Sequence, residues 1–259
     1  MYNFTDTDSR GSIKTLPAEA MRFNGLIFEN EIDGYRTLGV SGRELVSKSI
    51  ITKNVEGRDG VLFSLSNYNS RNLTVHYQMS SEDARSFRSN FNRLNALLIG
   101  EQVPITFNDE PRYTWYGTLG QISLPTEGLI DVVSEFEIFC ADPFKYDLEQ
   151  ERAGIGSVII NEKFDYPILP ERIKVTPESN TEVITLTSAD KIIKLDDAFL
   201  SGKDIEIDFN TGDILINGVL RPQAMHFSSD LETFYLVSNG EVSVSPSMPI
   251  TVSYRRKTL

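Results

Sequence analysis

The sequence predicts a mainly β protein with two domains. At 259 residues the chain is longer than one hydrophobic core usually supports, so two cores are expected. Short apolar runs separated by glycine, proline and asparagine recur along most of the chain, which is typical of antiparallel strands and their turns. We expect a β-rich first domain over residues 1–150 with one packed helix, followed by a β-sandwich over residues 151–259.

The first quarter of the chain predicts an extended N-terminal segment and three short strands. Residues 1–20 are polar and aperiodic, so we expect an extended or loosely attached segment. Met21–Leu26 is a short strand with a turn at Asn24-Gly25, a dipeptide suited to positive φ. Leu45–Val55 and Val61–Leu65 follow as an outgoing and a returning strand. The turn between them, Gly57–Gly60, carries Arg58 and Asp59.

The next strand and the helix have clear periodicities. Leu73–Met79 alternates, with its large apolar residues on one face and His76 on the other, where a solvated side chain is expected. The segment from Ser80 to Gly100 has helical spacing, with Ser80 as the expected N-cap and Gly100 as the end. The helix's apolar stripe, expected to pack on the sheet, consists of Ala84, Phe87, Phe91, Leu94 and Leu98.

Basic side chains lie away from that stripe, at Arg85, Arg88 and Arg93. Such residues are more often a solvated face than a binding patch. In an assembling protein they could also meet the carboxylates of a neighbouring subunit. Glu82 and Asp83 are expected in the first helical turn, where carboxylates suit the positive end of the helix dipole.

The stretch from Asn108 to Tyr146 predicts a pair of strands that closes the first sheet. Aromatic residues alternate with small polar ones from Tyr113 to Leu119, and the connection Gln121–Gly128 contains proline and glycine. In the second strand, Phe136, Ile138 and Cys140 point to one side, whereas Glu135 and Glu137 point to the other. Asp142-Pro143 ends this strand, because proline cannot donate to a ladder.

The second half begins with a predicted linker, Asp147–Val158, which is charged and contains two glycines. Beyond it, short apolar runs alternate with turns, and their number and spacing predict a β-sandwich. The runs are residues 168–169, 173–175, 183–186, 192–195, 205–209, 214–216, 233–237, 242–244 and 250–254.

Composition excludes several classes of function. The formal net charge is −12, and clustered basic residues of the kind that bind phosphates are missing, so a nucleic-acid binder is not expected. An acidic surface repels DNA, but the charge alone favours ordinary solubility as its explanation. Neither a membrane span nor a secretory signal is expected, because no apolar run is long enough and the first residues lack a basic region.

Catalytic and metal-binding motifs are also not expected. His76 and His226 lack the spacing of a metal motif, and no cofactor fingerprint occurs. Cys140 lies on the apolar face of a strand, where a small buried hydrophobe is expected rather than a reactive thiol. Glu135 and Glu137 resemble a glycosidase pair only in type, and two carboxylates on one strand face are usually solvated. We therefore predict that the protein is not an enzyme.

Several motifs resemble one known family. Asn108–Tyr113 reads N-D-E-P-R-Y, Trp115–Leu119 reads W-Y-G-T-L, and Phe136–Tyr146 reads F-E-I-F-C-A-D-P-F-K-Y. Together they resemble the distal tail protein family of long-tailed, non-contractile bacteriophages. The resemblance extends over nearly the whole chain, to Phe23–Gly25, Val55–Gly60, Ile205–Phe209, Thr211-Gly212, Ile216–Gly218 and Val252–Arg256.

The resemblance implies a structural virion protein at the distal tail tip, synthesised in the cytoplasm of the bacterial host. Its first domain would form a homo-hexameric ring, with the tail tube protein above and a tail-tip protein below. The second domain would be a galectin-like sandwich that projects outward and positions receptor-binding or baseplate proteins. DNA would pass through the central channel without being bound, and neither a cofactor nor a membrane is implied.

The residues expected to serve assembly are therefore structural. Asp109, Glu110 and Arg112 are predicted to lock the ring core by ion pairs. Asp142, Pro143 and Phe144 are predicted to fix the turn into the linker. Further assembly candidates are the turn residues Arg58 and Asp59 and the helix residues Arg85 and Arg88.

A carbohydrate-binding adhesin acting through the second sandwich is the alternative function. Galectin-type sites need a cluster of His, Asn, Arg and Glu with a tryptophan that stacks on the sugar. The second half contains His226 but no tryptophan, because Trp115 lies in the first half. This distribution argues against sugar binding of the galectin type.

Overall fold

The computed structural model describes residues 15–123, 125 and 129–259, and it consists mainly of β-strands in two compact units. The first unit ends at Lys145 and the second covers Tyr146–Thr258. Of the predicted extended N-terminal segment, residues 1–14 lie outside the described residues. No described helix has the length and apolar character needed to span a membrane.

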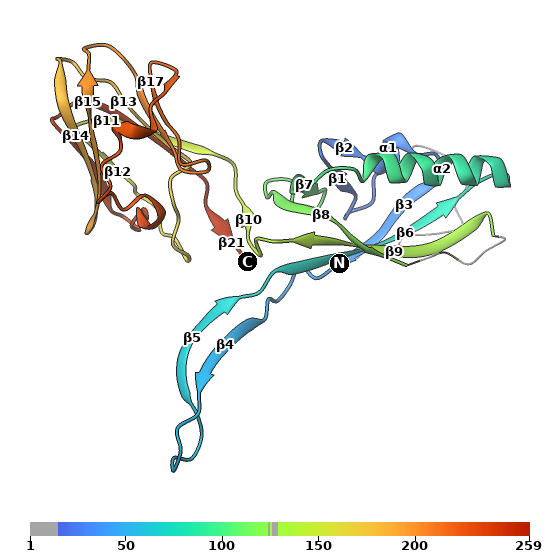
Figure 1. The fold of residues 1–259 in the computed structure, drawn as a ribbon. Helices are drawn as coiled ribbons and strands as arrows, with labels where there is room; N and C mark the ends of the chain where they lie inside the picture. Colours follow the sequence, from blue (N-terminus) through green and yellow to red (C-terminus); the bar gives the residue numbers. More distant parts are fainter. Residues whose placement is uncertain (1–14, 124, 126–128) are drawn as a thin grey trace. The chain divides into compact units, whose positions relative to one another are not determined.

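The first unit is built on a seven-stranded antiparallel sheet with the strand order β2-β1-β7-β8-β9-β6-β3. Figure 1 shows helix α2 lying along one face of this sheet. The strands are β1 (Met21–Phe23), β2 (Leu26–Ile27), β3 (Tyr35–Ser41), β6 (Arg71–Ser80), β7 (Val103–Phe107), β8 (Trp115–Ile122) and β9 (Asp131–Cys140).

The strand patterns predicted for this unit are confirmed. In β9, Phe136, Ile138 and Cys140 are buried, whereas Glu135 and Glu137 remain partly exposed on the other face. β6 pairs with β9 along its whole length and buries every second residue, from Arg71 to Met79. The turn between β1 and β2 has positive φ at both Asn24 and Gly25, as the dipeptide predicts.

The helix differs from its prediction at its start and in its burial. α2 covers Ala84–Leu97, and its N-cap is Asp83, whose carboxylate accepts the Ser86 N–H at 2.7 Å. The predicted cap Ser80 belongs to β6 instead, because strand pairing with Asp131 takes that residue. The short helix α1 covers Phe28–Glu31.

The apolar stripe of α2 is buried only at its C-terminal end. Leu94 and Leu98 are buried, but Phe87 and Phe91 are half-buried and Ala84 is exposed. The two phenyl rings contact each other, with their centroids 4.8 Å apart. The prediction that both phenylalanines are buried against the sheet is therefore confirmed only in part, because the rings pack against the core but keep part of their surface exposed.

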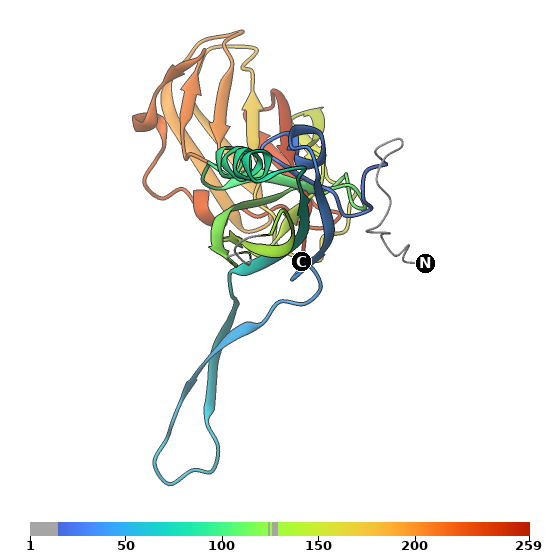
Figure 2. The same cartoon turned by 90° about the vertical axis from the view of Figure 1, so that its right-hand side faces the viewer.

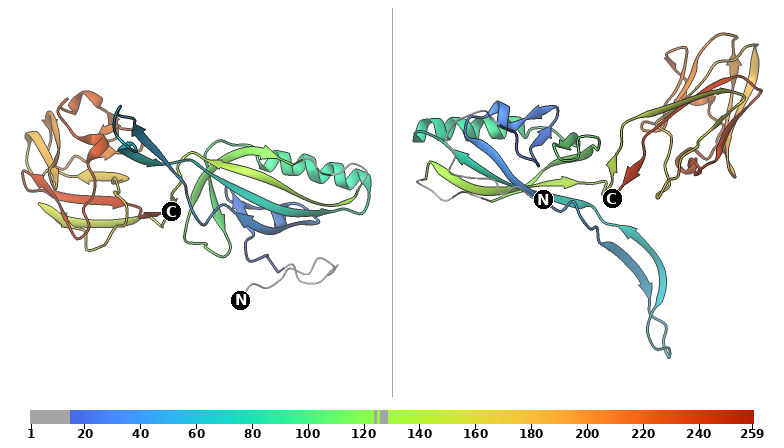
Figure 3. Two further views of the ribbon diagram at one scale, coloured as in Figure 1. Left: turned by 90° about the horizontal axis from the view of Figure 1, so that it is seen from below. Right: turned by 180° about the vertical axis from the view of Figure 1, so that it is seen from behind.

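A two-stranded hairpin leaves the sheet between β3 and β6. It consists of β4 (Lys48–Lys53) and β5 (Leu62–Tyr68), which pair only with each other among the described strands. The hairpin extends away from the sheet in each view of Figures 1 to 3. We call residues 48–68 the arm. Its strands were predicted, but its separation from the sheet was not.

The second unit is a sandwich of two sheets around one core. The larger sheet has the order β11-β20-β13-β16-β17-β18 and the smaller has the order β12-β19-β14-β15. One cluster of buried residues from both sheets fills the space between them. The strands are β11 (Gln150–Ile155), β12 (Ser157–Ile159), β13 (Arg172–Val175), β14 (Thr181–Ser188), β15 (Lys191–Phe199), β16 (Ile205–Asp208), β17 (Ile214–Ile216), β18 (Val219–Leu220), β19 (Glu241–Ser245) and β20 (Pro249–Tyr254).

Three predicted segments of this half have other structures. Residues 168–169 and 233–237 are irregular, with a single bridge between Ile168 and Leu236 and the 3-10 helix η2 (Leu231–Thr233). The predicted linker 147–158 contains β11 and part of β12, and Asp147 is buried beside Arg256, with Oδ2 at 2.6 Å from Nη2. Polarity suggested a linker because these residues pair through their backbones and leave their side chains in solvent. The remaining elements are β10 (Lys145–Tyr146), η1 (Pro222–Ala224) and β21 (Lys257–Thr258).

Candidate functional site

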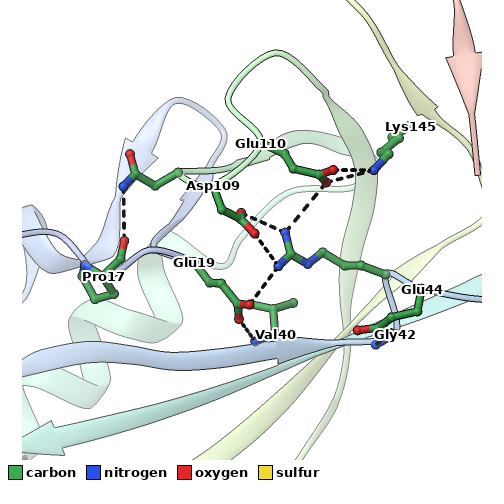
Figure 4. A network of polar contacts seen from close by, with 10 residues as sticks. Pro17, Glu19, Val40, Gly42, Glu44, Asp109, Glu110 and Lys145 are labelled. Carbon is green, nitrogen blue, oxygen red and sulfur yellow. Dashed lines mark hydrogen bonds and ion pairs between the residues drawn. The ribbon is translucent and has the colours of Figure 1, made fainter. Parts of the chain in front are cut away.

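A buried guanidinium organises the polar residues of the first unit. Arg43 follows β3, and its side chain is only 11% exposed. Both of its terminal nitrogens donate to the carboxylate of Asp109, at 2.9 and 2.8 Å, and Nη2 lies 3.1 Å from Glu19. Figure 4 shows Glu19 and Asp109 converging on this point from two different segments of the chain. A bidentate pair of this kind fixes both direction and distance between the segments.

Lys145 extends this network on the side of Glu110. Its Nζ lies 2.9 Å from both carboxylate oxygens of Glu110, and it also lies 4.9 Å from the centre of the Tyr113 ring. Glu110 in turn lies 3.9 Å from Arg43. We call the residues Glu19, Arg43, Asp109, Glu110 and Lys145 the Arg43 network. It joins the start of the chain, the end of β3, the loop after β7 and the end of the first unit.

The surroundings of Arg43 favour its charged form. Burial by itself lowers the pKa of the guanidinium, but its hydrogen bond to Asp109 and the charges of Asp109, Glu19 and Glu110 outweigh that effect. The pKa of Arg43 is therefore raised above its ordinary value, so the guanidinium keeps its charge.

A glycine allows Arg43 to reach this position. Gly42 has a φ of +90°, and a Cβ added there would lie 2.1 Å from the Asn72 carbonyl oxygen. Only glycine fits such a place without a backbone shift. The Gly42-Arg43 pair was therefore a sequence signal for this site, although sequence reasoning singled out neither residue.

The predicted assembly residues fall into separate places. Asp109 and Glu110 are brought together, but their described cation partners are Arg43 and Lys145 of the same chain. Arg112 lies further along the same loop, with its side chain exposed. The role predicted for these three residues between subunits stays a prediction.

Asp142, Pro143 and Phe144 form the turn after β9. Asp142 Oδ1 accepts the Phe144 N–H at 3.0 Å. The rings of Phe144 and Tyr68 contact each other edge-on, with their centroids 5.8 Å apart. The Lys48 ammonium also lies over the Tyr68 ring, 4.3 Å from its centre. The turn therefore holds the base of the arm, because Lys48 and Tyr68 are its first and last residues.

The arm carries large apolar side chains that are exposed to solvent. Phe63 is 66% exposed and Ile50 is 63% exposed. On the other side of the hairpin, Ile51 lies opposite Leu65, and both are exposed. Arg58 and Asp59 lie in the exposed turn at the tip. Contiguous apolar surface of this kind marks an interaction site in a soluble protein.

A polar face lies on the side of the sheet opposite α2. Three carboxylates of β9 each meet a polar side chain of β6, all at 3.0 to 3.1 Å. The pairs are Glu137 with Asn72, Glu135 with His76, and Asp131 with Gln78. We call this surface the acidic face.

The remaining candidates are surface or core features. Arg85 and Arg88 are exposed on α2, and Arg88 lines a cleft of about 290 Å³ between α2 and the β8–β9 strands. Burial raises the pKa of the Cys140 thiol to about 12, which agrees with a core residue. Trp115 is only 1% exposed, so its ring is not available to stack on a sugar. Among the described residues, no group of three potential ligands could hold a metal ion.

The chain matches two families of phage tail domains. Residues 30–161 match the phage tail protein RIFT-related domain, which is more than half of the chain. Residues 165–257 match the siphovirus-type tail component, C-terminal domain. The distal tail protein of Bacillus phage SPP1 is 24% identical over 237 residues, which is 85% of this chain and 89% of that protein.

Solved structures have the same fold. The crystal structure of SPP1 Dit, described as a paradigm of the hub adsorption apparatus in phages of Gram-positive hosts, has a TM-score of 0.80 at 21% identity. That match covers 93% of this chain and 99% of the other. A chain of the phage P2 baseplate in its activated conformation with Ca has a TM-score of 0.55 at 10% identity, covering 87% of this chain and 91% of that one. At these identities the likeness shows the fold, and it extends over both units.

Proposed function

This chain belongs to the distal tail protein family of siphoviruses, and we propose that six copies of it form a hub ring at the distal end of a phage tail. Its place is the distal tail tip of the virion. Membership of the family supports the hub role. The exposed apolar side chains of the arm are the observation that supports a ring. The number six is the one that the family resemblance implies.

The arm needs a partner surface. An isolated two-stranded hairpin is marginally stable in water, and this one carries large apolar side chains on both of its faces. Covering those side chains with another subunit removes apolar surface from water and stabilises the hairpin at the same time. The arm would then lie on a different patch of the next copy, and such head-to-tail contacts close into a ring when the rotation permits.

The Arg43 network gives the ring subunit a rigid centre. It ties four separate segments of the first unit together through buried or half-buried ion pairs. The Tyr68–Phe144 contact fixes the base of the arm beside this centre. A fixed arm direction lowers the conformational entropy lost on association, so assembly is favoured.

The acidic face suits a channel through which DNA passes. Asp131, Glu135 and Glu137 would repel the phosphate backbone, and no counterion release would hold the DNA in place. The formal charge of −12 on each copy adds to this effect. We place this face toward the channel, and α2 with its exposed Arg85 and Arg88 toward other subunits or tail proteins.

The partners proposed for this hub are tail proteins. The first unit would contact the tail tube protein on one side and a tail-tip protein on the other. The second unit would position receptor-binding or baseplate proteins. Relatives are structural tail proteins, and we propose the same for this chain, without catalytic activity, cofactor or membrane partner.

Electron microscopy of the purified full-length chain tests the ring. The wild type should give ring-shaped particles, whereas the double variant Ile50→Ser with Phe63→Ser should give single subunits. A matched control changes exposed apolar residues of the second unit, Val219→Ser with Leu220→Ser, and should keep the rings. Rings in the arm variant, or none in the wild type, would contradict the proposal.

A further inference from the structure

The second unit contains a long edge strand that is covered by an irregular segment. β15 has nine residues and lies at the end of the four-stranded sheet. The unpaired backbone groups of such a strand are a template for pairing with another chain. Here residues 225–230 run beside it, and we call Met225–Asp230 the strap.

The strap occupies the outward backbone groups of two β15 residues. At Ile192, the carbonyl accepts the Asp230 N–H at 2.8 Å, and the amide donates to Asp230 Oδ2 at 3.1 Å. At Lys194, the carbonyl accepts the His226 N–H at 2.9 Å, and the amide donates to Ser229 Oγ at 3.0 Å. All four groups therefore have partners in the strap.

Side chains replace the backbone where the strap departs from strand geometry. Met225 forms an antiparallel bridge with Leu195, as a regular strand would. Further along, Ser229 Oγ and Asp230 Oδ2 act as the acceptors that a neighbouring strand's carbonyls would supply. Serine and aspartate are the residue types that imitate backbone groups in this way.

The strap is also held within itself. His226 Nδ1 lies 2.7 Å from Ser228 Oγ, and the His226 ring lies 4.4 Å from the Phe227 ring. The cover is thus a shaped segment rather than a loose loop. It leaves the apolar side chain of Ile192, which is 46% exposed, next to the edge that it closes.

The other outer strands of this sandwich need less protection. β12 has three residues and β18 has two, so they offer short edges. β11 carries the charged pair Glu151-Arg152 on its edge. Short length and charge are the usual means of blocking edge pairing. β15 has nine residues, and its charged side chains Lys191 and Lys194 flank the apolar pair Ile192–Ile193 rather than interrupt it.

We propose that the strap is a guard that prevents the β15 edge of one copy from pairing with the β15 edge of a second copy. Opening it would expose the paired groups of Ile192 and Lys194 and create a self-complementary antiparallel contact. The guard confines self-association to surfaces outside the sandwich, and this role does not depend on the ring proposed above.

Hydrogen exchange and light scattering of the full-length chain test the guard together. In the double variant Ser229→Ala with Asp230→Ala, the Ile192 and Lys194 amides should exchange roughly tenfold faster, because each loses its acceptor. The mass measured by light scattering should then rise to roughly twice that of the wild-type state, as pairs form through β15. The thiol introduced by Lys194→Cys should form a disulfide between two copies only in that double variant.

Two controls keep the result specific. Ser228→Ala removes the neighbouring hydroxyl, whose described bonds stay within the strap, and should leave both amides protected. Asp230→Asn keeps an acceptor oxygen for Ile192 and should leave the mass unchanged. Faster exchange without any added association would show that the edge does not self-pair. Unchanged exchange would show that these bonds do not hold the strap, and either result would overturn the proposal.

Discussion

The arm and the β15 edge are both places where β-structure could pair or pack with another chain, yet the structure leaves them in opposite states. The arm presents Ile50, Phe63 and their neighbours to solvent on both faces of a free hairpin. The strap takes up the outward backbone groups of β15 with its own amides and side-chain oxygens. The first unit thus leaves apolar side chains exposed, whereas the second covers the edge of its own sheet. From this difference we infer that the first unit carries the assembly surface and that the second does not.

The two cores support the same division. Each unit has its own cluster of buried hydrophobic residues, one between the helices and the seven-stranded sheet and one between the two sheets of the sandwich. In the part of the chain that the structure describes, the arm's residues belong to neither cluster. Their absence from both cores supports the proposal that the arm's apolar side chains serve association.

The strongest contrast is expected between two identical substitutions, one in a core and one on the arm. Phe234→Ala removes a fully buried ring of the second unit and should lower the free energy of unfolding by about 3–5 kcal/mol. Phe63→Ala removes an exposed ring and should change the stability of the single subunit by less than about 0.5 kcal/mol, while weakening assembly. Urea unfolding measures the first effect and sedimentation the second. A destabilisation by Phe63→Ala equal to that of Phe234→Ala would place the arm in a core.

The Arg43 network should give the next largest effect. Arg43→Ala leaves Glu19, Asp109 and Glu110 without their shared cation, and we expect a loss of about 1–3 kcal/mol, since these carboxylates are partly exposed. Arg43→Lys keeps the charge but loses the bidentate geometry, so about 1 kcal/mol is expected. Arg58→Ala at the exposed arm tip is the matched control and should be neutral. Denaturant unfolding of the three variants would refute the network's role if Arg43→Ala matched Arg58→Ala.

The half-buried helix stripe should give a smaller effect. The Phe91 ring is half-buried, so Phe91→Ala should lower the free energy of unfolding by about 1–2 kcal/mol, less than the loss of a fully buried ring. Leu94→Ala, a fully buried position one turn later, should cost more than Phe91→Ala. Thermal or urea unfolding ranks the two variants. The reverse order would show that Phe91 is covered by another subunit or a tail protein.

Cys140 should show no effect until the chain unfolds. Burial raises the pKa of its thiol to about 12, so the reactive thiolate is nearly absent in the folded chain at neutral pH. Iodoacetamide at pH 8 should leave the folded protein unmodified and should alkylate it in urea. Rapid modification of the folded chain would place the β9 end, and with it the turn at Asp142, in an opened state.

Alternation and turn chemistry were enough to predict most of the fold. The β9 pattern, the Asn24-Gly25 turn and the sandwich strands depend on residues that are close together in the sequence, so they could be predicted from it. The ends and the burial of α2 could not be predicted. Ser80 belongs to strand β6, and the strand that pairs with it there, β9, is distant in sequence. The family resemblance pointed to assembly, but it did not indicate which contacts lie within one chain.

The candidate sites were only half predictable for the same reason. Asp109 and Glu110 were visible as charged loop residues, whereas Arg43 and Lys145 join them across long sequence separations. The strap had no signal, because serine and aspartate in a loop usually mean no more than a turn. The free arm was hidden as well, since its alternation is the same as that of a strand inside a sheet.

Light scattering of the two separated units tests the division of labour most directly. The chain is cut at the junction of the two units, giving residues 1–145 and 146–259, so that the second fragment keeps β11 and β12. We predict that the first fragment assembles and the second stays monomeric. Assembly of the first should improve from very low to moderate salt, because screening over about 8–10 Å weakens repulsion between acidic subunits. A monomeric first fragment beside an oligomeric second one would contradict the account.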